Sequence, residues 1–151
     1  MKLNLRTILT LTEALTYSER LELAAAALHA QFSDDALPPE TIASFLKRSF
    51  GARETLLVAA EADGKAWGLL LTGPFTDPLF GTTAPLVLVL TVDPSLRHRG
   101  VASELVHEAE AILKERGLPT LAARAAHNDD ALISMGERWG FVRAWELMVK
   151  E

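Results

Sequence analysis

Residues 87–106 read VLVLTVDPSLRHRGVASELV, and this stretch decides the fold. It begins with a run of β-branched residues and leucine, 87–92, which predicts a strand that ends at Asp93 and Pro94. A polar loop with three basic residues follows, and Gly100 separates it from a helix that opens on small side chains. Backbone N–H groups at a helix start have no partner inside the helix, and the helix dipole adds partial positive charge. The stretch therefore predicts a seat for a phosphorylated ligand, where a glycine permits an approach that a Cβ would prevent.

Composition indicates one globular domain over residues 1–151, with 49% hydrophobic and 23% charged residues. The formal net charge of −5 argues against a general nucleic-acid-binding face. The absence of cysteine excludes disulfides, thiolate metal sites and a cysteine nucleophile, and it suits a reducing cytoplasm. No sustained apolar stretch precedes Arg6 and Glu13, so no signal peptide or membrane span is expected. We expect a cytoplasmic protein that binds neither metal nor membrane.

Hydrophobic spacing predicts strands and helices in the order strand, two helices, three strands, helix, strand, helix, strand. The expected strands are 3–8, 54–61, 65–72, 86–92, 121–126 and 141–149. The expected helices run from a capping box at Thr16–Glu19 to about Phe32, from about Pro38, from Val101 to 116, and from an N-cap at Asn128 to Gly140.

Two segments decide how these strands join. Asp63-Gly64 predicts a hairpin turn between antiparallel strands, whereas the strands on either side of the 101–116 helix should be parallel. We therefore expect a mixed sheet. Glycine and proline are frequent in 73–85, which predicts a long loop.

Two short motifs, in this order of elements, resemble the GCN5-related N-acetyltransferases. Residues 97–102 (RHRGVA) match the family's R/Q-x-x-G-x-G/A signature and follow a Val-Asp-Pro strand end. Asn128, with the Gly-Phe pair at 140–141, resembles the second signature, an asparagine that opens a helix ending in Gly-Phe. The resemblance implies an α/β (α+β) class and a single-domain acyl-CoA N-acyltransferase fold. Its mixed, twisted sheet would be splayed at the cofactor site and flanked by about four helices.

The resemblance also implies acetyl-CoA as co-substrate, lying in the gap between the strands 86–92 and 121–126. Its pyrophosphate would accept backbone N–H bonds from residues 99–103, and Arg97 and Arg99 would add charge complementarity. Its pantetheine arm would pair with the strand end 90–92. The implied cofactor-binding residues are Leu90, Thr91, Val92, Arg97, His98, Arg99, Gly100, Val101, Ala102, Ser103 and Asn128.

The implied activity is acetyl transfer to an unidentified amine by direct attack on the thioester. This reaction needs a route for the amine proton, donors to the developing oxyanion and an acid for the thiolate. The family pattern makes the backbone N–H of Val92 the oxyanion donor. His127 is the best remaining candidate for proton transfer, because imidazole titrates near neutral pH, although the residue pattern alone favours a solvated strand-end histidine. Glu61 and Asp63 would act only through water, and a hairpin tip would leave both solvated.

Three features depart from the family pattern. Gly136 stands where relatives usually carry a tyrosine acid, Tyr17 is the chain's only tyrosine, and no carboxylate lies inside the 86–92 strand. A non-catalytic acyl-CoA-binding module, a degenerate acetyltransferase, therefore remains an alternative. A protein-interaction domain without any cofactor is a third reading.

The acceptor site departs from the pattern as well. Only residues 142–151 follow Phe141, where relatives usually spend more chain on the strands and loop that wall this site. We expect Phe75 and Phe80 to replace that wall, beside the helix connection 33–39. The acceptor would be a small-molecule or peptide amine, and the unpaired edge of the final strand is compatible with a homodimer.

Overall fold

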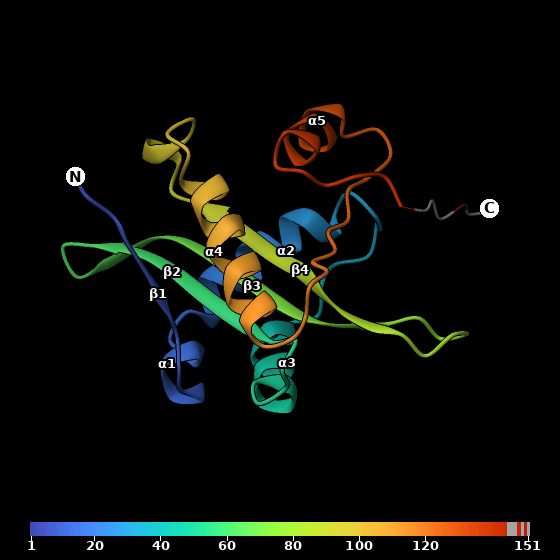
Figure 1. The fold of residues 1–151 in the computed structure, drawn as a ribbon, viewed down its shortest axis with the longest axis horizontal. Helices are drawn as coiled ribbons and strands as arrows, with labels where there is room; N and C mark the ends of the chain where they lie inside the picture. Colours follow the sequence, from blue (N-terminus) through green and yellow to red (C-terminus); the bar gives the residue numbers. More distant parts are fainter. Residues whose placement is uncertain (145–147, 149, 151) are drawn as a thin grey trace.

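A four-stranded antiparallel sheet in the order β1-β2-β3-β4 forms the centre of the molecule (Figure 1). The computed structural model describes residues 1–144, 148 and 150. The strands are β1 (Asn4–Thr7), β2 (Leu56–Ala62), β3 (Lys65–Thr76) and β4 (Thr83–Val92). The α-helices are α1 (Leu11–Leu15), α2 (Ser18–His29), α3 (Thr41–Ser49), α4 (Val101–Glu115) and α5 (Asp130–Arg138), and a 3₁₀ turn spans Pro94–Leu96.

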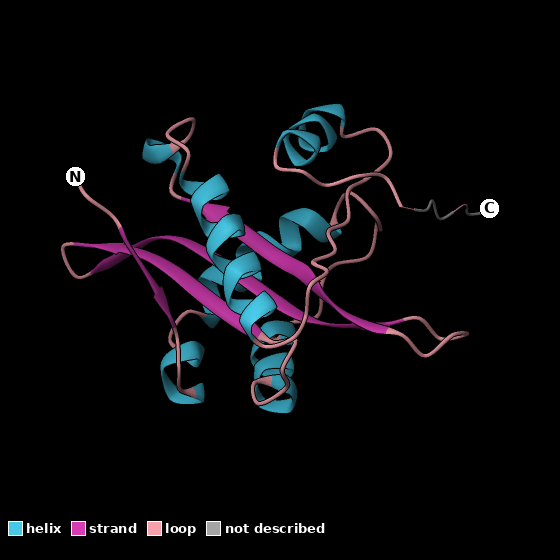
Figure 2. Cartoon of the chain, in the orientation of Figure 1, coloured by secondary structure: helices cyan, strands magenta, loops and turns pink. Residues whose placement is uncertain are grey.

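The two faces of the sheet bury two separate hydrophobic cores. Successive side chains of a strand point to opposite faces, so Leu57 and Ala59 of β2 join the core under α1, α2 and α3. Leu56 and Val58 join the other core, under α4. Helix α4 crosses that face of the sheet (Figure 2). Its buried residues are Val101, Leu105, Val106, Ala109 and Leu113.

A glycine in β3 places the first turn of α4 close to the sheet. A Cβ on Gly68 would lie 3.0 Å from Leu105 Cδ1 and 3.3 Å from Val101 Cγ1. Gly68 pairs with Val92, the last residue of β4. The register therefore places the start of α4 beside the end of β4.

Residues 73–85 do not form the predicted loop. β3 continues to Thr76 and pairs with β4 from Thr83 onward, so only the six residues between them form a turn. In that turn the carboxylate of Asp77 accepts the N–H groups of Leu79 and Phe80. Proline is tolerated at free strand edges, and the pairing of β3 with β2 ends at Thr72. The prolines of residues 73–85 therefore did not exclude strand structure.

The N-terminal helices also differ from the prediction. Helix α1 was missed, and Thr16 ends it by donating its hydroxyl proton to Glu13 O, rather than capping the next helix. Helix α2 begins after Tyr17, which makes no side-chain capping bond, and it ends at His29, three residues before Phe32. Helix α2 thus follows directly on the last turn of α1. A capping-box pattern in the sequence does not distinguish such a continuation from the start of a separate helix.

The C-terminal strands were over-predicted. The segment 121–126 makes one isolated bridge, between Leu86 and Ala122, and this bridge is parallel as expected. Residues 141–144 are not a strand. The rest of the strand predicted at 141–149 falls largely on 145–147 and 149, which lie outside the described residues. Within the described part of the chain, no helix is long and apolar enough to cross a membrane.

Candidate active site

The loop after β4 is fixed at its base and open at its tip. The carboxylate of Asp93 accepts the backbone N–H of Ser95 at 3.0 Å and its hydroxyl at 2.7 Å. These bonds lower the pKa of Asp93, and Lys65 Nζ adds an ion pair at 3.6 Å. Leu96 is buried, which anchors the 3₁₀ turn to the core. The basic residues 97–99 are exposed beyond this anchor.

The start of α4 is unobstructed. Gly100 is the N-cap, with a left-handed φ of 78°, and no side chain caps the helix. The first bond of the helix runs from Glu104 N–H to Gly100 O at 3.0 Å, so the N–H groups of residues 101–103 have no partner within the helix. Nothing lies within 4 Å of a Cβ built on Gly100. Neither Arg97 nor Arg99 forms an ion pair with a described residue.

β4 and the segment 121–126 meet at one point only. There Val87 N–H donates to Ala122 O and Ala122 N–H donates to Pro85 O, both at 2.9 Å. At the far end of β4, Asp93 N–H donates to Trp67 O of β3 at 2.8 Å. Because donors alternate between the two edges of an antiparallel strand, the N–H of Val92 points to the edge away from β3. The end of β4 thus offers free backbone groups on the side facing the gap.

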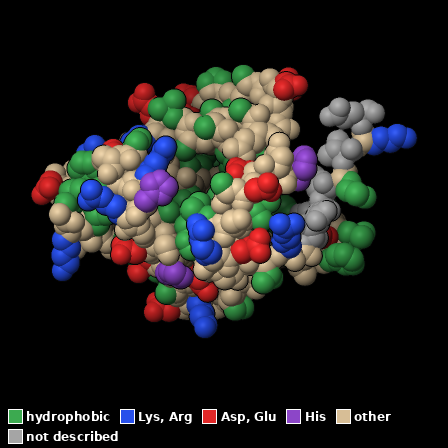
Figure 3. Space-filling model, turned by 90° about the horizontal axis from the view of Figure 1, so that it is seen from above, with side chains coloured by type: hydrophobic (Ala, Val, Ile, Leu, Met, Phe, Trp, Pro, Cys, Tyr) green, Lys and Arg blue, Asp and Glu red, His purple; other side chains and the backbone are tan. Residues whose placement is uncertain are grey.

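The gap is visible on the surface. Seen from above, the molecule is hollowed near its centre, and hydrophobic side chains line the hollow (Figure 3). In Figure 1 the chain after α4 passes beside β4 and continues to α5, while the loop after β4 lies at the opposite upper corner. The hollow lies between these two regions.

His127 and Asn128 lie at the end of the segment 121–126, and both are exposed. Asn128 is not the N-cap that the sequence predicted. The N-cap of α5 is Asp129, whose Oδ1 accepts the N–H of Leu132 at 3.1 Å. Both residue types cap helices well, and the carboxylate also interacts favourably with the helix dipole. The side chain of Asn128 is therefore not used to cap α5.

A second hollow opens between α2, α3 and β4, on the face of the sheet opposite α4. It is a cleft of about 490 Å³. Its lining includes Leu88 and Val89 of β4 and Arg124 of the facing segment, so the cleft adjoins the gap between them. Phe75 and Phe80 do not line it. The 73–85 hairpin projects away from the body of the molecule (Figure 1), so it does not wall this cleft, and its role at an acceptor site stays a prediction.

Sequence reasoning missed three cationic or titratable residues of this cleft. His29 ends α2, Arg48 lies in the last turn of α3, and Arg124 lies with its guanidinium carbon 5.8 Å from the ring centre of Phe32. One signal was present in the sequence, because Arg124 is the sole charged residue of the run LAARAA. The sequence around His29 and around Arg48 gave no indication that these two residues line the same cleft.

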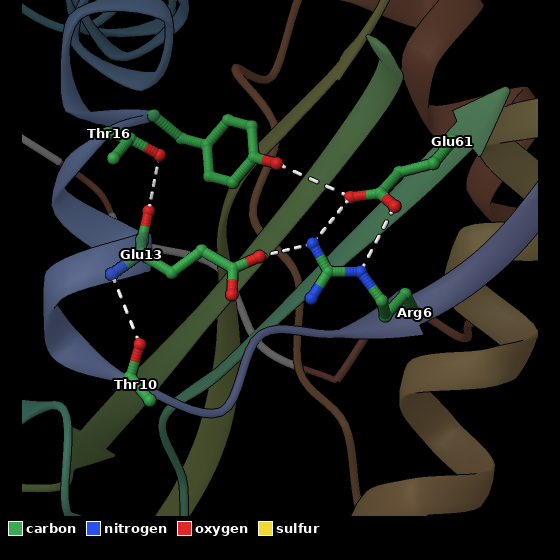
Figure 4. A network of polar contacts seen from close by, with 6 residues as sticks. Arg6, Thr10, Glu13, Thr16 and Glu61 are labelled. Atoms are coloured by element: carbon green, nitrogen blue, oxygen red, sulfur yellow. Dashed lines mark hydrogen bonds and ion pairs between the residues drawn. The ribbon is translucent and has the colours of Figure 1, made fainter. Parts of the chain in front are cut away.

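Glu61 lies in a polar network at the opposite edge of the sheet (Figure 4). Arg6 Nε donates to Glu61 Oε2 at 3.0 Å, and Arg6 also pairs with Glu13. The hydroxyl of Tyr17 donates to Glu61 Oε1 at 3.3 Å. Arg6 lowers the pKa of Glu61, while burial and then the charge of Glu61 raise the pKa of Tyr17.

This network occupies the side chains of Glu61 and Tyr17. Glu61 is not the solvated hairpin carboxylate that the sequence suggested, because it is held by Arg6. Tyr17 is committed to Glu61, and β3 separates β2 from β4 in the sheet. Gly136, where a tyrosine was expected, lies in α5 with only Phe141 Cβ near its own Cβ position, at 4.0 Å.

The model of the Acetyltransferase (GNAT) family matches residues 20–141. The fold is similar to that of the aminoglycoside N-acetyltransferase AAC(6')-Iy in complex with a CoA-S-monomethyl-acetylneamine bisubstrate analog, at 18% identity, with 100% of this chain and 98% of that chain covered and a TM-score of 0.74. A ribosomal-protein-alanine N-acetyltransferase from Brucella melitensis biovar Abortus 2308 is also similar, at 19% identity, 100% and 98% coverage and a TM-score of 0.70.

A third similar structure is the aminoglycoside 6'-N-acetyltransferase AAC(6')-Ih from Acinetobacter baumannii, at 19% identity, 99% and 97% coverage and a TM-score of 0.68. At these identities the likeness concerns the fold. It confirms the predicted α/β class and N-acyltransferase fold, here with a four-stranded antiparallel sheet and five α-helices.

Proposed function

The chain belongs to the Acetyltransferase (GNAT) family, and we propose that it transfers the acetyl group of acetyl-CoA to an amine. One observation carries the proposal. In a chain of this family, the uncapped start of α4 follows the basic loop 97–99. It lies beside the end of β4, where the edge of β4 that faces away from β3 is free because the segment 121–126 pairs with β4 only near Leu86. These are the features that an elongated thioester with a phosphorylated end requires.

We assign the pyrophosphate to the loop and helix start. The N–H groups of 99–103 would bind its oxygens, since helix N-termini favour anions. Arg97, His98 and Arg99 surround this position without ion-pair partners among the described residues. The open space at Gly100 leaves room for a phosphate against the backbone.

The pantetheine arm would lie along Leu90, Thr91 and Val92, taking the backbone groups that face the gap. Asn128, free of the capping role, would contact the arm from the other wall. The whole chain 1–151 would then act as one cytoplasmic domain.

The proposed reaction is a direct displacement. The neutral amine forms a C–N bond with the thioester carbonyl carbon, the C–S bond breaks, and the nitrogen loses a proton. The Val92 N–H would stabilise the oxyanion. His127, exposed at the end of the gap wall, is our candidate to accept the amine proton, directly or through water. With Tyr17 committed and glycine at 136, the coenzyme A thiolate would leave without a tyrosine acid and take its proton from solvent.

Release of free coenzyme A, measured with a panel of amines and with no amine, tests the proposal. We expect release that depends on the amine, and a His127→Gln variant should change its pH profile while leaving acetyl-CoA binding intact. The missing tyrosine at 136 favours a second candidate, a non-catalytic acyl-CoA-binding module. That protein would bind acetyl-CoA, but none of the amines would cause it to release free coenzyme A.

Binding is measured separately by thermal shift. A ligand at roughly 100-fold over its dissociation constant adds about 2.7 kcal/mol to the free energy of unfolding. Acetyl-CoA at about 1 mM should therefore raise the melting temperature. No shift at all would exclude both proposed functions and leave a protein-interaction domain.

A further inference from the structure

The cleft between α2, α3 and β4 carries a charge opposite to that of the whole chain. The chain has a formal net charge of −5. The lining of the cleft nevertheless contains Arg48 and Arg124, with His29, and neither aspartate nor glutamate. The acidic residues that give the chain its net negative charge are therefore not part of the lining of this cleft.

Neither arginine is neutralised by a neighbouring carboxylate. Arg48 and Arg124 form no ion pair or hydrogen bond with a described side chain, and Arg124 only approaches the ring of Phe32. Glu22 is a neighbouring acidic residue, on α2. It accepts the N–H of Ile42 at 3.1 Å in the first turn of α3, and it does not line the cleft. Two guanidinium groups thus remain available to a ligand.

The two arginines come from different elements. Arg48 is carried by α3, while Arg124 is carried by the segment that faces β4 across the gap. Much of the remaining lining is apolar, with Leu28, Phe45 and Leu88 among its residues. A ligand that fits this lining has an apolar body and an anionic group that pairs with a guanidinium group of the lining. Guanidinium groups bind carboxylates and phosphates with paired, charge-assisted hydrogen bonds.

The same charges would help the reaction. A positive charge near an amine disfavours its ammonium form and lowers its pKa. The nucleophile must be neutral, and the structure provides no free carboxylate in the lining to take its proton. An amine held near Arg48 and Arg124 would therefore be deprotonated at a lower pH than in water.

We propose that the acceptor is an amine that carries an anionic group, a carboxylate or a phosphate, on a compact and mainly apolar body. This inference rests on the proposed acetyl transfer and specifies its substrate class. It disfavours a polycation, which two unpaired arginines would repel.

Matched amines test the inference. L-phenylalanine is compared with phenethylamine, L-leucine with isoamylamine, and O-phosphoethanolamine with ethanolamine, and spermidine and kanamycin represent polycations. We expect kcat/KM for the preferred anionic acceptor to exceed that of its anion-free counterpart about ten- to hundredfold, the value of one charge-assisted hydrogen-bond pair. A preference for the anion-free amines or the polycations would overturn the inference while leaving acetyl transfer intact.

Variants locate the effect. Arg48→Gln and Arg124→Gln should remove the preference and move the pH profile of kcat/KM to higher pH, and Arg124→Lys should restore part of both. Lys47→Gln is the matched control, because Lys47 is exposed on the same helix and does not line the cleft. Equal loss for both members of each amine pair would overturn the assignment of the arginines.

If no amine releases coenzyme A, the proposed function fails and binding alone decides the inference. The protein saturated with coenzyme A is then mixed with N-acetyl-L-phenylalanine or with N-acetylphenethylamine. A rise in melting temperature with the carboxylate compound alone supports an anion-selective cleft. Equal shifts, or no shift with either compound, overturn it.

Discussion

Gly100 is the residue at which backbone conformation and proposed chemistry coincide. Its φ of 78° lies in the left-handed region, and the space above its Cα is open. A glycine is required twice here, once for the turn that starts α4 and once for the approach of a phosphate. The side chains of the loop are less constrained, because the backbone supplies the donors.

A Gly100→Glu variant tests this residue. It places a carboxylate where the pyrophosphate should bind, so we expect the affinity for acetyl-CoA to fall by far more than tenfold. Binding is measured by isothermal titration calorimetry. Affinity retained within a factor of about ten, or 1.4 kcal/mol, would show that the phosphate lies elsewhere.

The matched control is Gly117→Glu, at the other end of α4. Gly117 has a φ of 81° and also nothing within 4 Å of its Cβ position. Both variants should lose about 1–2 kcal/mol of stability through the left-handed conformation. Only the variant at 100 should lose acetyl-CoA, which separates a binding defect from a folding defect.

At the scale of elements, the strand, loop and helix of 87–106 could be predicted because their signals are local. The Val-Leu run, Asp93-Pro94, Gly100 and the helical spacing of 101–113 each act within a few residues. The lengths of β3 and β4 could not be predicted, because Pro74 and Pro85 are compatible with strand only at edges that the sheet leaves free. That condition depends on where β2 ends.

The proposed site could be inferred from the sequence in its cofactor half and not in its acceptor half. The loop 97–103 is one continuous stretch, so its motif is visible in the sequence. Arg48 and Arg124 are 76 positions apart, and only the tertiary structure brings α3 and the segment 121–126 to one cleft. The network of Arg6 with Glu61 likewise depends on the register of β1 with β2.

Two neighbouring residues at the start of α5 have different expected roles: Asp129 is structural, and Asn128 is a proposed binding residue. Asp129→Ala should lower the free energy of unfolding by about 1 kcal/mol, because it removes the N-cap, with little direct effect on acetyl-CoA. Asn128→Ala should leave stability unchanged and weaken acetyl-CoA binding. Urea unfolding and calorimetric titration of both variants measure the two effects. The reverse pattern would mean that Asn128 caps the helix in solution.

At the scale of the whole molecule, four arginines near the proposed site, Arg48, Arg97, Arg99 and Arg124, form no ion pair with a described residue. Arg6, at the opposite edge of the sheet, is instead paired with two carboxylates. The network at that edge therefore has a structural role, joining β1, β2 and the α1–α2 turn (Figure 4). Its consequence is a dependence of stability on pH.

Glu61 sets the sign of that dependence. Its pKa is lower in the folded state than its ordinary value of 4.5, because Arg6 stabilises the carboxylate. The stabilisation is therefore complete above the unfolded pKa and is lost as pH falls through the folded pKa. We expect urea midpoints to fall on acidification below about pH 4.5, and Glu61→Gln should flatten this decrease. Glu110→Gln, exposed on α4, is the control and should retain it. A Glu61→Gln curve parallel to the parent curve would contradict the assignment.

The central claim is that the gap beside β4 holds acetyl-CoA with its phosphates on the start of α4. A crystal structure with coenzyme A tests it most directly. We expect pyrophosphate oxygens within about 3 Å of the backbone nitrogens of 99–103, with the pantetheine arm between 90–92 and the segment 121–128. Coenzyme A bound elsewhere, with residues 99–103 free of phosphate, would contradict it.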